Sequence, residues 1–218
     1  MAEIKACLFD LDGVIVDTAK YHFLAWGRLC KEFGYELSEE ENENLKGISR
    51  AESLNILLRK AGKEASEAEK QEMMARKNGW YLDHVNAMKP DEILPGVKDF
   101  MEALRQKGIR IGLGSASKNA LPIVEKIGVL PYLEVVIDGN KVTRGKPDPQ
   151  TFSLGAEAIG VEPRHCVVFE DAVAGIDAAL AGGFFAIGVG KPEILGHAHK
   201  VIPGFQDVKL SIFDDLET

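Results

Sequence analysis

Two acidic side chains follow an apolar segment close to the start of the chain. Residues 6–9 have the length and composition of a buried strand, and Asp10 and Asp12 come directly after them. In an open α/β sheet, ligands bind beyond the carboxyl ends of the strands. A buried carboxylate without a partner is costly, so packing alone explains this pair poorly. The pattern predicts a site at which both carboxylates serve a cation or a reacting group.

Three further groups of polar residues end predicted strands later in the chain. The first offers hydroxyl groups and helix-start amides suited to a phosphate, in Ser115, Ala116, Ser117, Lys118 and Asn119. Lys146 then stands before a helix that starts with proline, and Glu170 and Asp171 close an apolar strand. Each alone is more typical of a helix cap, a turn or a solvated loop. Together with the Asp10 and Asp12 pair, and in this order along the chain, these three groups indicate phosphoryl transfer.

Phosphoryl transfer needs donors that hold the phosphate, a cation that neutralises it and a nucleophile in line with the leaving oxygen. Asp10 could attack phosphorus and form an aspartyl phosphate, and Asp12 could move the proton on the substrate hydroxyl. Mg²⁺ prefers oxygen ligands, so Asp10 and Asp171 are its expected side-chain ligands. Glu170 would lie nearby, and the Asp12 carbonyl would be a further ligand. Lys146 would offset the charge between Asp10 and the phosphate.

The alternation of apolar and amphipathic segments predicts an α/β fold, a Rossmann-like doubly wound parallel sheet with helices on both faces. We expect strands at residues 5–11, 109–115, 134–138, 166–170 and 185–189. We expect helices between them at residues 97–106, 121–127, 149–159 and 173–181. Each helical pattern ends at a glycine, as helix termini commonly do.

Residues 18–88 differ from the rest of the chain. They are rich in Glu, Lys, Asn and Leu, show long helical periodicity and contain no convincing strand. Because this block directly follows the first strand, it predicts a helical cap inserted over the active-site end of the sheet. The expected organisation is an α/β catalytic core of residues 1–17 and 89–218 with a helical cap of residues 18–88.

The composition excludes some kinds of binding partner. The formal net charge of -8 argues against a general nucleic-acid or acidic-membrane surface. Three scattered cysteines, Cys7, Cys30 and Cys166, are too few for a disulfide framework and are expected as reduced thiols. The chain begins with a strand in place of an apolar leader and has no span of about 18 apolar residues. We expect a cytoplasmic enzyme, and nothing in the sequence demands more than a monomer.

The motifs resemble those of the haloacid dehalogenase superfamily. Residues 10–18 match Asp-x-Asp-Gly-Val-x-x-Asp-Thr, and the serine, lysine and Glu-Asp motifs follow in the family's order. This resemblance covers essentially the whole chain but names no substrate, because phosphatases of many substrates share the framework. Residues 21–26, 45–54 and 76–78, together with residues 115–119, resemble the β-phosphoglucomutase family more closely. That family interconverts β-D-glucose 1-phosphate and D-glucose 6-phosphate.

The resemblance implies a Mg²⁺-dependent phosphomutase, an isomerase that acts on a small phosphorylated sugar through β-glucose 1,6-bisphosphate. It implies that Asp10 is the nucleophile and Asp12 the general acid/base. The transferring phosphate would be held by Ser115, Ala116 and Lys146. The distal phosphate would be held by Arg50, Ser117, Lys118 and Asn119. The sugar side of the cap would be lined by Lys46, Gly47, Ile48, Ser53 and Lys77. Cap closure would be coupled to Asp12 through Thr18, His22 and Lys77.

A physical argument supports a second anion site. A mutase must bind a bisphosphate in two orientations, and the Arg50 guanidinium offers a bidentate fork that lysine lacks. From residue type alone, Lys46 and Arg50 would more often form a solvated helix face. His22 alone would more often be a packing residue. Trp26 is among the substrate-binding candidates, although its simplest role is in the cap core.

Two other functions remain open at this level. A capped sugar-phosphate phosphatase would use Asp10 and Asp12 in the same way, with water as the phosphoryl acceptor. A signalling receiver domain also phosphorylates an aspartate beside Mg²⁺, but it needs no helical insert. The sequence departs from the mutase pattern at Gly114, where a residue such as alanine is common, and in residues 139–145 before Lys146.

Overall fold

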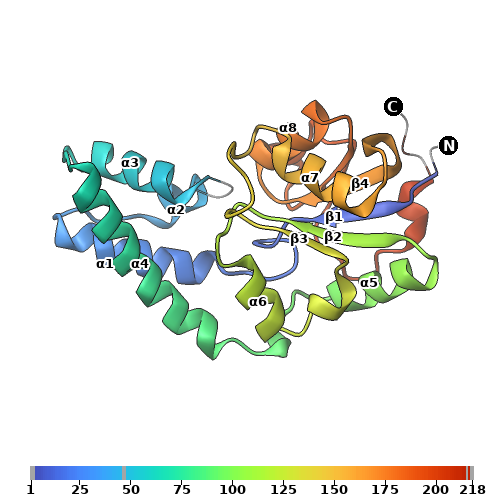
Figure 1. Ribbon diagram of the computed structural model, residues 1–218, viewed down its shortest axis with the longest axis horizontal. Coiled ribbons are helices and arrows are strands. Elements are labelled where there is room, and N and C mark those ends of the chain that lie inside the picture. Colours follow the sequence, from blue (N-terminus) through green and yellow to red (C-terminus); the bar gives the residue numbers. More distant parts are fainter. Residues whose placement is uncertain (1–2, 46–47, 215, 217–218) are drawn as a thin grey trace.

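A six-stranded parallel sheet forms the centre of the computed structural model, which describes residues 3–45, 48–214 and 216 (Figure 1). Its strands are β1 (Ala6–Phe9), β2 (Arg110–Gly114), β3 (Val135–Ile137), β4 (Cys166–Glu170), β5 (Phe185–Val189) and β6 (Lys200–Ile202). They lie in the order β3-β2-β1-β4-β5-β6, and every neighbouring pair is parallel. The predicted α/β fold with a parallel sheet is confirmed.

Helices cover both faces of this sheet. One face packs against α5 (Val97–Gln106), α6 (Ala120–Lys126) and the short helix η4 (Leu210–Phe213). The other packs against α7 (Gln150–Ile159), α8 (Val173–Ala181) and α9 (Pro192–Leu195). The single-turn helices η1 (Pro90–Glu92), η2 (Leu130–Tyr132) and η3 (Pro163–His165) lie in the connections.

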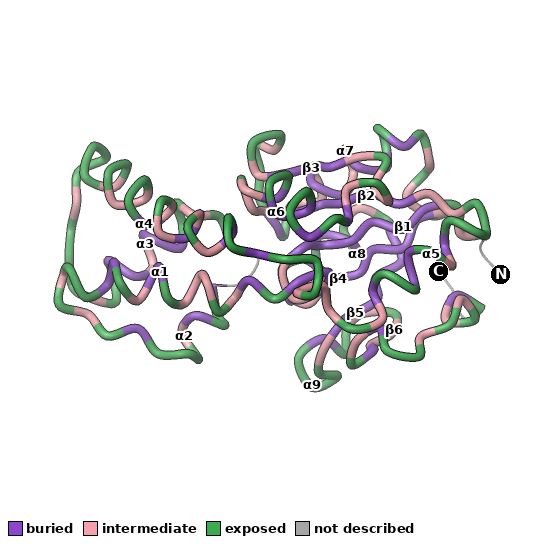
Figure 2. Tube along the Cα trace, turned by 90° about the horizontal axis from the view of Figure 1, so that it is seen from below, coloured by how far each residue is buried: buried purple, intermediate pink, exposed green. Residues whose placement is uncertain are grey.

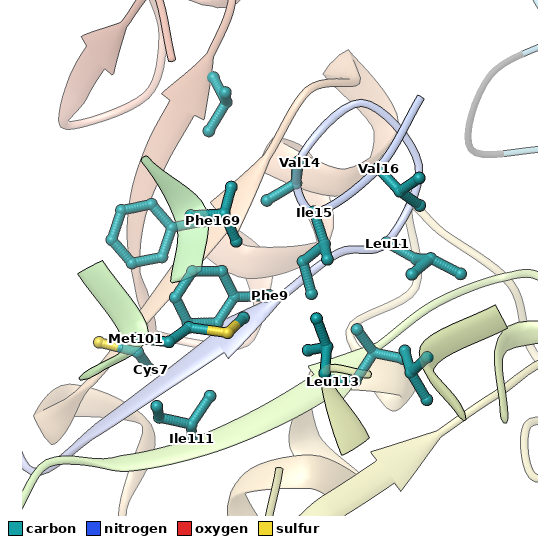
Figure 3. Packing of buried hydrophobic residues seen from close by; sticks show 14 of the residues in the cluster. Cys7, Phe9, Leu11, Val14, Ile15, Val16, Met101, Ile111, Leu113 and Phe169 are labelled. Atoms are coloured by element: carbon teal, nitrogen blue, oxygen red, sulfur yellow. The ribbon is translucent and has the colours of Figure 1, made fainter. Parts of the chain in front are cut away.

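The alternation of strand side chains separates two cores. Phe9 of β1 points to the α5 face, where its ring stacks on that of Phe169 at 4.8 Å between centroids (Figure 3). Leu8 points to the α7 face and packs in the same cluster as Phe152. Burial of one such aromatic or leucine side chain contributes about 1.5–3 kcal/mol. β1 and β4 are therefore held rigidly at the middle of the sheet, where their ends carry Asp10 and Glu170.

A helical insertion lies between β1 and β2. It contains α1 (Ala19–Glu32), α2 (Glu39–Glu43), α3 (Arg50–Lys60) and α4 (Glu67–Ala87), and Figure 1 shows them as a separate lobe. Serine side chains at positions 38, 49 and 66 cap the starts of α2, α3 and α4. The lobe has its own apolar core around Trp26, Leu29, Leu54 and Leu57. Figure 2 shows its buried segments facing inward between the helices.

The two connections between insertion and sheet run side by side. Val16 forms an antiparallel bridge with Ile93, and the Leu94 amide donates to the Ile15 carbonyl at 2.9 Å. Near these connections the Tyr21 hydroxyl of α1 donates to a carboxylate oxygen of Glu92 at 2.5 Å. This pairing places the insertion beyond the carboxyl ends of the strands, the edge at which Asp10 lies.

Some element boundaries differ from the sequence prediction. β1 ends at Phe9, two residues before the predicted end, so Asp10 and Asp12 lie in the turn that leaves the sheet. β6 was not predicted, because it begins with Lys200 and offers only two apolar residues before Pro203. Within the described part of the chain, no helix is long and apolar enough to cross a membrane.

Candidate active site

Lys146 joins two carboxylates at the centre of the sheet edge. Its ammonium Nζ donates to Asp10 Oδ1 at 2.5 Å and to Glu170 Oε1 at 2.6 Å, and also reaches the Gly114 carbonyl at 3.2 Å. Asp10 follows β1, Glu170 ends β4, and Gly114 ends β2. The ends of three neighbouring strands are therefore all bonded to the ammonium group of Lys146. The Lys146 side chain is fully buried.

Opposing effects act on the charge of Lys146. Burial alone would lower its pKa, but the carboxylates of Asp10 and Glu170 outweigh burial and raise it. Burial also raises the pKa of Glu170 in spite of its bond to Lys146. Because both partners are desolvated, removal of either would leave an uncompensated buried charge. Lys146 is therefore a permanent cation within the cluster.

Asp171 comes close to this cluster through a glycine turn. Carboxylate oxygens of Asp10, Glu170 and Asp171 lie within 4.8 Å of one another. Gly13 has a φ of +79°, and a Cβ at that position would meet Asp171 Oδ2 at 2.0 Å. A side chain at residue 13 would thus occupy the space of the Asp171 carboxylate, so the turn after β1 requires glycine for both its backbone and its close approach.

Asp12 takes part in a chain of hydroxyl groups. Its Oδ1 accepts a hydrogen bond from the Thr18 hydroxyl, which in turn accepts from the Tyr81 hydroxyl of α4 at 3.2 Å. Burial, followed by the negative charge of Asp10, raises the pKa of Asp12 to about 7, and the Thr18 hydrogen bond opposes the rise. Asp12 can therefore hold or release a proton near neutral pH, as a general acid/base must.

The segment after β2 presents hydroxyls and amides at the same edge. The Ser115 hydroxyl accepts from the Ser117 amide at 3.1 Å, and the Ser117 hydroxyl accepts from the Asn119 amide at 3.2 Å. The Asn140 side chain donates to the Lys118 carbonyl at 3.0 Å and so ties this segment to the loop after β3. The turn is held by its own side chains, in a form suited to an anion.

The insertion contributes a buried cationic group. Lys77 of α4 is 1 % exposed; its Nζ lies 2.8 Å from His22 Nδ1 and 4.5 Å from the centre of the Trp26 ring. Burial, followed by the charge of Arg50, lowers the pKa of Lys77 to about 7. Burial and then Lys77 lower the pKa of His22. An arriving anion would favour the protonated form of Lys77.

One cleft of about 660 Å³ brings the two parts together. From the sheet it is lined by Asp10, Asp12, Ser115, Ala116, Ser117, Lys118, Glu170 and Asp171. From the insertion it is lined by His22, Trp26, Ile48, Arg50, Ser53 and Lys77. The remaining predicted residues lie beside it: Thr18 bonds to Asp12, Lys146 to Asp10, and Asn119 to Asn78 of α4 at 2.8 Å. Lys46 and Gly47 lie outside the described residues.

The sequence profile of the haloacid dehalogenase-like hydrolases matches residues 4–183. The chain belongs to this family. It is 39% identical over 214 residues to a β-phosphoglucomutase of Bacillus subtilis, covering 97% of this chain and 95% of that protein. It is 34% identical over 193 residues to a hexitol phosphatase of Escherichia coli, covering 86% and 84%. The crystal structure of a β-phosphoglucomutase from Clostridium difficile superposes with a TM-score of 0.93 at 38% identity, covering 97% and 96%.

The three carboxylates of this haloacid dehalogenase-like hydrolase suit a hard cation. Asp10, Glu170 and Asp171 bring three negative charges to one point, and Lys146 is the ammonium bonded to the first two. The raised pKa of Glu170 reflects the cost of holding this charge away from water. A divalent cation with oxygen ligands and retained waters would relieve it. The residues present therefore fit such a metal ion.

Sequence reasoning missed three residues of this family member's site. Tyr81 completes the hydroxyl chain to Asp12, and Asn78 bonds across the cleft to Asn119. Thr151 lines the cleft from the first turn of α7. Helical spacing could have revealed Tyr81, which lies one turn after Lys77, because residues four apart share a helix face. Asn78 lies in the 76–78 segment of the family resemblance but was given no role, and no comparable pattern identifies Thr151.

Proposed function

We propose that the protein is a Mg²⁺-dependent β-phosphoglucomutase that interconverts β-D-glucose 1-phosphate and D-glucose 6-phosphate. Residues 1–17 and 89–218 would form its catalytic core, and residues 18–88 a cap that closes over the substrate. The observation that carries the proposal is a single cleft with phosphate-binding groups on both walls: Ser115 on the sheet side and Arg50 on the insertion side. The similarity to β-phosphoglucomutases over nearly the whole chain supports the same choice.

A bisphosphate needs two anion sites at once. At the sheet edge, Lys146 and the Ser115 turn offer donors beside Asp10. At the insertion, the Arg50 fork can hold a second phosphate with two parallel hydrogen bonds, and Lys118 adds a cation from the opposite wall. Neutral His22 and proton-labile Lys77 would adjust the charge of this wall as an anion enters. Lys46 and Gly47 stay predicted sugar contacts.

The reaction would proceed in two transfers. An Asp10 oxygen attacks the phosphorus of the bisphosphate, the bond from phosphorus to the sugar oxygen breaks, and Asp12 gives its proton to that oxygen. In the second transfer a sugar hydroxyl gives its proton to Asp12 and attacks the aspartyl phosphate, which restores Asp10. A pKa of about 7 suits Asp12 to both directions. Mg²⁺, held by Asp10 and Asp171 with Glu170 nearby, would supply charge neutralisation of the phosphoryl group.

Closure of the cap would protect the aspartyl phosphate from water while the bisphosphate turns round. The hydroxyl chain from Tyr81 of α4 through Thr18 to Asp12 links the insertion to the acid/base. A shift of α4 would therefore change the hydrogen bond that Asp12 receives. We propose that Thr18, His22 and Lys77 couple closure to proton transfer in this way.

A sugar-phosphate phosphatase is the second candidate. The similarity to a hexitol phosphatase favours it, since Asp12 could equally activate a water that attacks the aspartyl phosphate. A receiver-like phospho-acceptor module is less suited, because it would need neither the α1–α4 insertion nor the basic residues that line the cleft from it.

A coupled assay tests the proposal. The enzyme is given β- or α-glucose 1-phosphate with Mg²⁺ and a catalytic amount of β-glucose 1,6-bisphosphate, and glucose 6-phosphate and inorganic phosphate are followed together. We expect glucose 6-phosphate from the β-anomer alone, little released phosphate, and no turnover by Asp10→Asn. Stoichiometric phosphate without glucose 6-phosphate would overturn the mutase and support the phosphatase.

A further inference from the structure

Thr151 carries an unpaired hydroxyl beside the cleft. Its side chain is 1 % exposed, and among the described residues its Oγ1 is the one fully buried side-chain oxygen or nitrogen without a hydrogen-bond partner. Buried hydroxyls nearly always have such a partner, and leaving one without it is unfavourable. Thr151 also lines the same cleft as Asp10 and Ser115. An atom of a bound ligand could supply the missing hydrogen-bond partner of Thr151 Oγ1.

Local geometry explains why the protein itself offers no partner. A threonine inside a helix often bonds to the carbonyl four residues earlier. Thr151 is the second residue of α7, so the residue four positions earlier is Pro147, which lies outside the helix. On the other branch of the side chain, the methyl Cγ2 faces β2, 3.3 Å from where a Cβ on Gly114 would lie. The methyl is therefore packed, whereas the hydroxyl is not bonded.

The first turn of α7 packs against Lys146 and the end of β2. Lys146 Nζ is 4.6 Å from the centre of the Phe152 ring and bonds to the Gly114 carbonyl, the residue that the Thr151 methyl faces. The loop from β3 to α7 passes on the side of the sheet nearer the insertion (Figure 1). Thr151 thus shares neighbours with both Lys146 and the strand that delivers Ser115.

We propose that Thr151 is a further ligand-contacting residue, whose Oγ1 donates a hydrogen bond to an oxygen of the phosphoryl group at the Asp10 centre. This inference rests on the proposed phosphoryl-transfer function. A deprotonated phosphoryl oxygen only accepts hydrogen bonds, and a hydroxyl can donate to it without adding charge. Each donor hydrogen bond helps to hold the phosphoryl group against the repulsion of the Asp10, Glu170 and Asp171 carboxylates.

Two substitutions of Thr151 distinguish the effect of its hydroxyl from the effect of its side-chain volume. Thr151→Val keeps the packed volume and removes the hydroxyl, whereas Thr151→Ser keeps the hydroxyl and removes the methyl. We expect Thr151→Val to lower kcat/KM about tenfold for both β-glucose 1-phosphate and p-nitrophenyl phosphate, as loss of a hydrogen bond to a charged group does. Thr151→Ser should stay within about threefold of the parent by the same reasoning. Ser153→Ala, on the same helix but outside the cleft lining, controls for changes in α7.

A binding measurement supplies the second readout. Inorganic phosphate with Mg²⁺ should raise the Tm of the parent and of Thr151→Ser, and raise that of Thr151→Val less. Without phosphate, Thr151→Val should melt no lower than the parent, because the lost hydroxyl had no partner. If it melts lower and its phosphate-induced shift equals the parent's, a permanent internal partner satisfies Thr151 and the inference is overturned. Unchanged kcat/KM in Thr151→Val would overturn it as well.

These outcomes are separate from the fate of the proposed function. If the parent releases phosphate from p-nitrophenyl phosphate but forms no glucose 6-phosphate, the mutase proposal fails and the Thr151 comparison still stands. If the parent shows no phosphoryl transfer with any substrate, the inference is decided by the binding measurement alone. That measurement compares the phosphate-induced rise in Tm of the parent with that of Thr151→Val.

Discussion

At the scale of single residues, Lys146 is the group on which the site depends most. It is buried between Asp10 and Glu170, and these carboxylates raise its pKa, which favours its charged form. Without it, two desolvated carboxylates would repel each other. A bound metal ion and the lysine would act on the same excess of negative charge, so the loss of one should increase dependence on the other.

Lys146→Met tests this relation. We expect it to lower the free energy of unfolding in EDTA by about 3 kcal/mol, the usual cost of breaking a buried pair. Mg²⁺ should then raise the Tm of Lys146→Met more than that of the parent, because the cation meets a more negative site. Thermal unfolding with EDTA and with Mg²⁺ measures both, and Lys126→Met, at an exposed position on α6, is the control. Equal Mg²⁺ shifts in parent and Lys146→Met would contradict the argument.

The pKa of Asp12 makes folding stability depend on pH. Its carboxyl has a pKa of about 7 in the folded protein, against an ordinary value of 3.8. Between these values the unfolded chain has lost the proton and the folded protein has kept it, so stability falls as pH rises through this window. Below and above this pH window, Asp12 has the same charge in the folded and the unfolded state. Its contribution to the free energy of unfolding then does not change with pH.

Asp12→Asn should remove this dependence. In EDTA, the free energy of unfolding of the parent relative to Asp12→Asn should fall by about 2–4 kcal/mol between pH 4 and pH 8. Urea unfolding at a series of pH values measures it. Asp99→Asn changes an exposed carboxylate on α5 and should run parallel to the parent. A constant difference between the parent and Asp12→Asn across the pH range would show that Asp12 is not perturbed.

At the scale of elements, the turn after β1 decides where the carboxylates of two strands meet. Gly13 allows the chain to reverse with a φ of +79° and leaves room for Asp171, which follows β4. The turn therefore has two requirements, a backbone conformation and an empty volume. Only the second concerns the metal.

A pair of glycine substitutions distinguishes these requirements. Gly34 has a φ of +76° and no heavy atom within 4 Å of where a Cβ would lie, so Gly34→Ala should cost only the backbone strain of about 1 kcal/mol. Gly13→Ala should incur that strain and also displace the Asp171 carboxylate. We expect Gly13→Ala to weaken Mg²⁺ binding at least tenfold and Gly34→Ala to leave it unchanged. Calorimetric titration with Mg²⁺ measures this, and equal affinities would contradict it.

At the scale of the whole molecule, the proposed function depends on a cleft that neither lobe forms alone. The sheet lines it with Asp10, Asp12 and Ser115, and the insertion lines it with Arg50, Lys77 and Trp26. The two connections between the sheet and the insertion are paired through the bridge between Val16 and Ile93. Residues far from the reacting atoms should therefore affect the step that needs the second anion site more than the chemistry at Asp10.

Arg50→Ala should separate the two activities. We expect mutase flux to fall about 100-fold, the effect of losing a bidentate charge-assisted contact, whereas hydrolysis of the aspartyl phosphate should change less than about threefold. Arg59→Ala is a matched control, since Arg59 lies on the same helix, is exposed and pairs with Glu52 at 3.1 Å. Equal losses of flux and hydrolysis in Arg50→Ala would remove its role as the distal phosphate anchor.

The order of the candidate site residues along the chain was predictable from sequence. Strand ends carry Asp10, the Ser115 turn and Glu170, and a parallel sheet brings consecutive strand ends to one edge. Local patterns also predicted α5 at its observed bounds. The three-residue strand β6 was missed, although the equally short β3 was predicted, because β6 has only two apolar residues, Val201 and Ile202, between Lys200 and Pro203.

Local sequence patterns were enough to establish which groups reach the carboxyl edge of the sheet, because strand period and topology are encoded in the spacing of apolar residues. The chemical state of those groups depends on packing in three dimensions. The pKa of Asp12 depends on its burial and on Asp10 and Thr18, and that of Lys77 on packing against a separate helix. The unpaired hydroxyl of Thr151 likewise arises only when α7 is packed against β2. Charge and solvation act through space, over distances that sequence spacing does not contain.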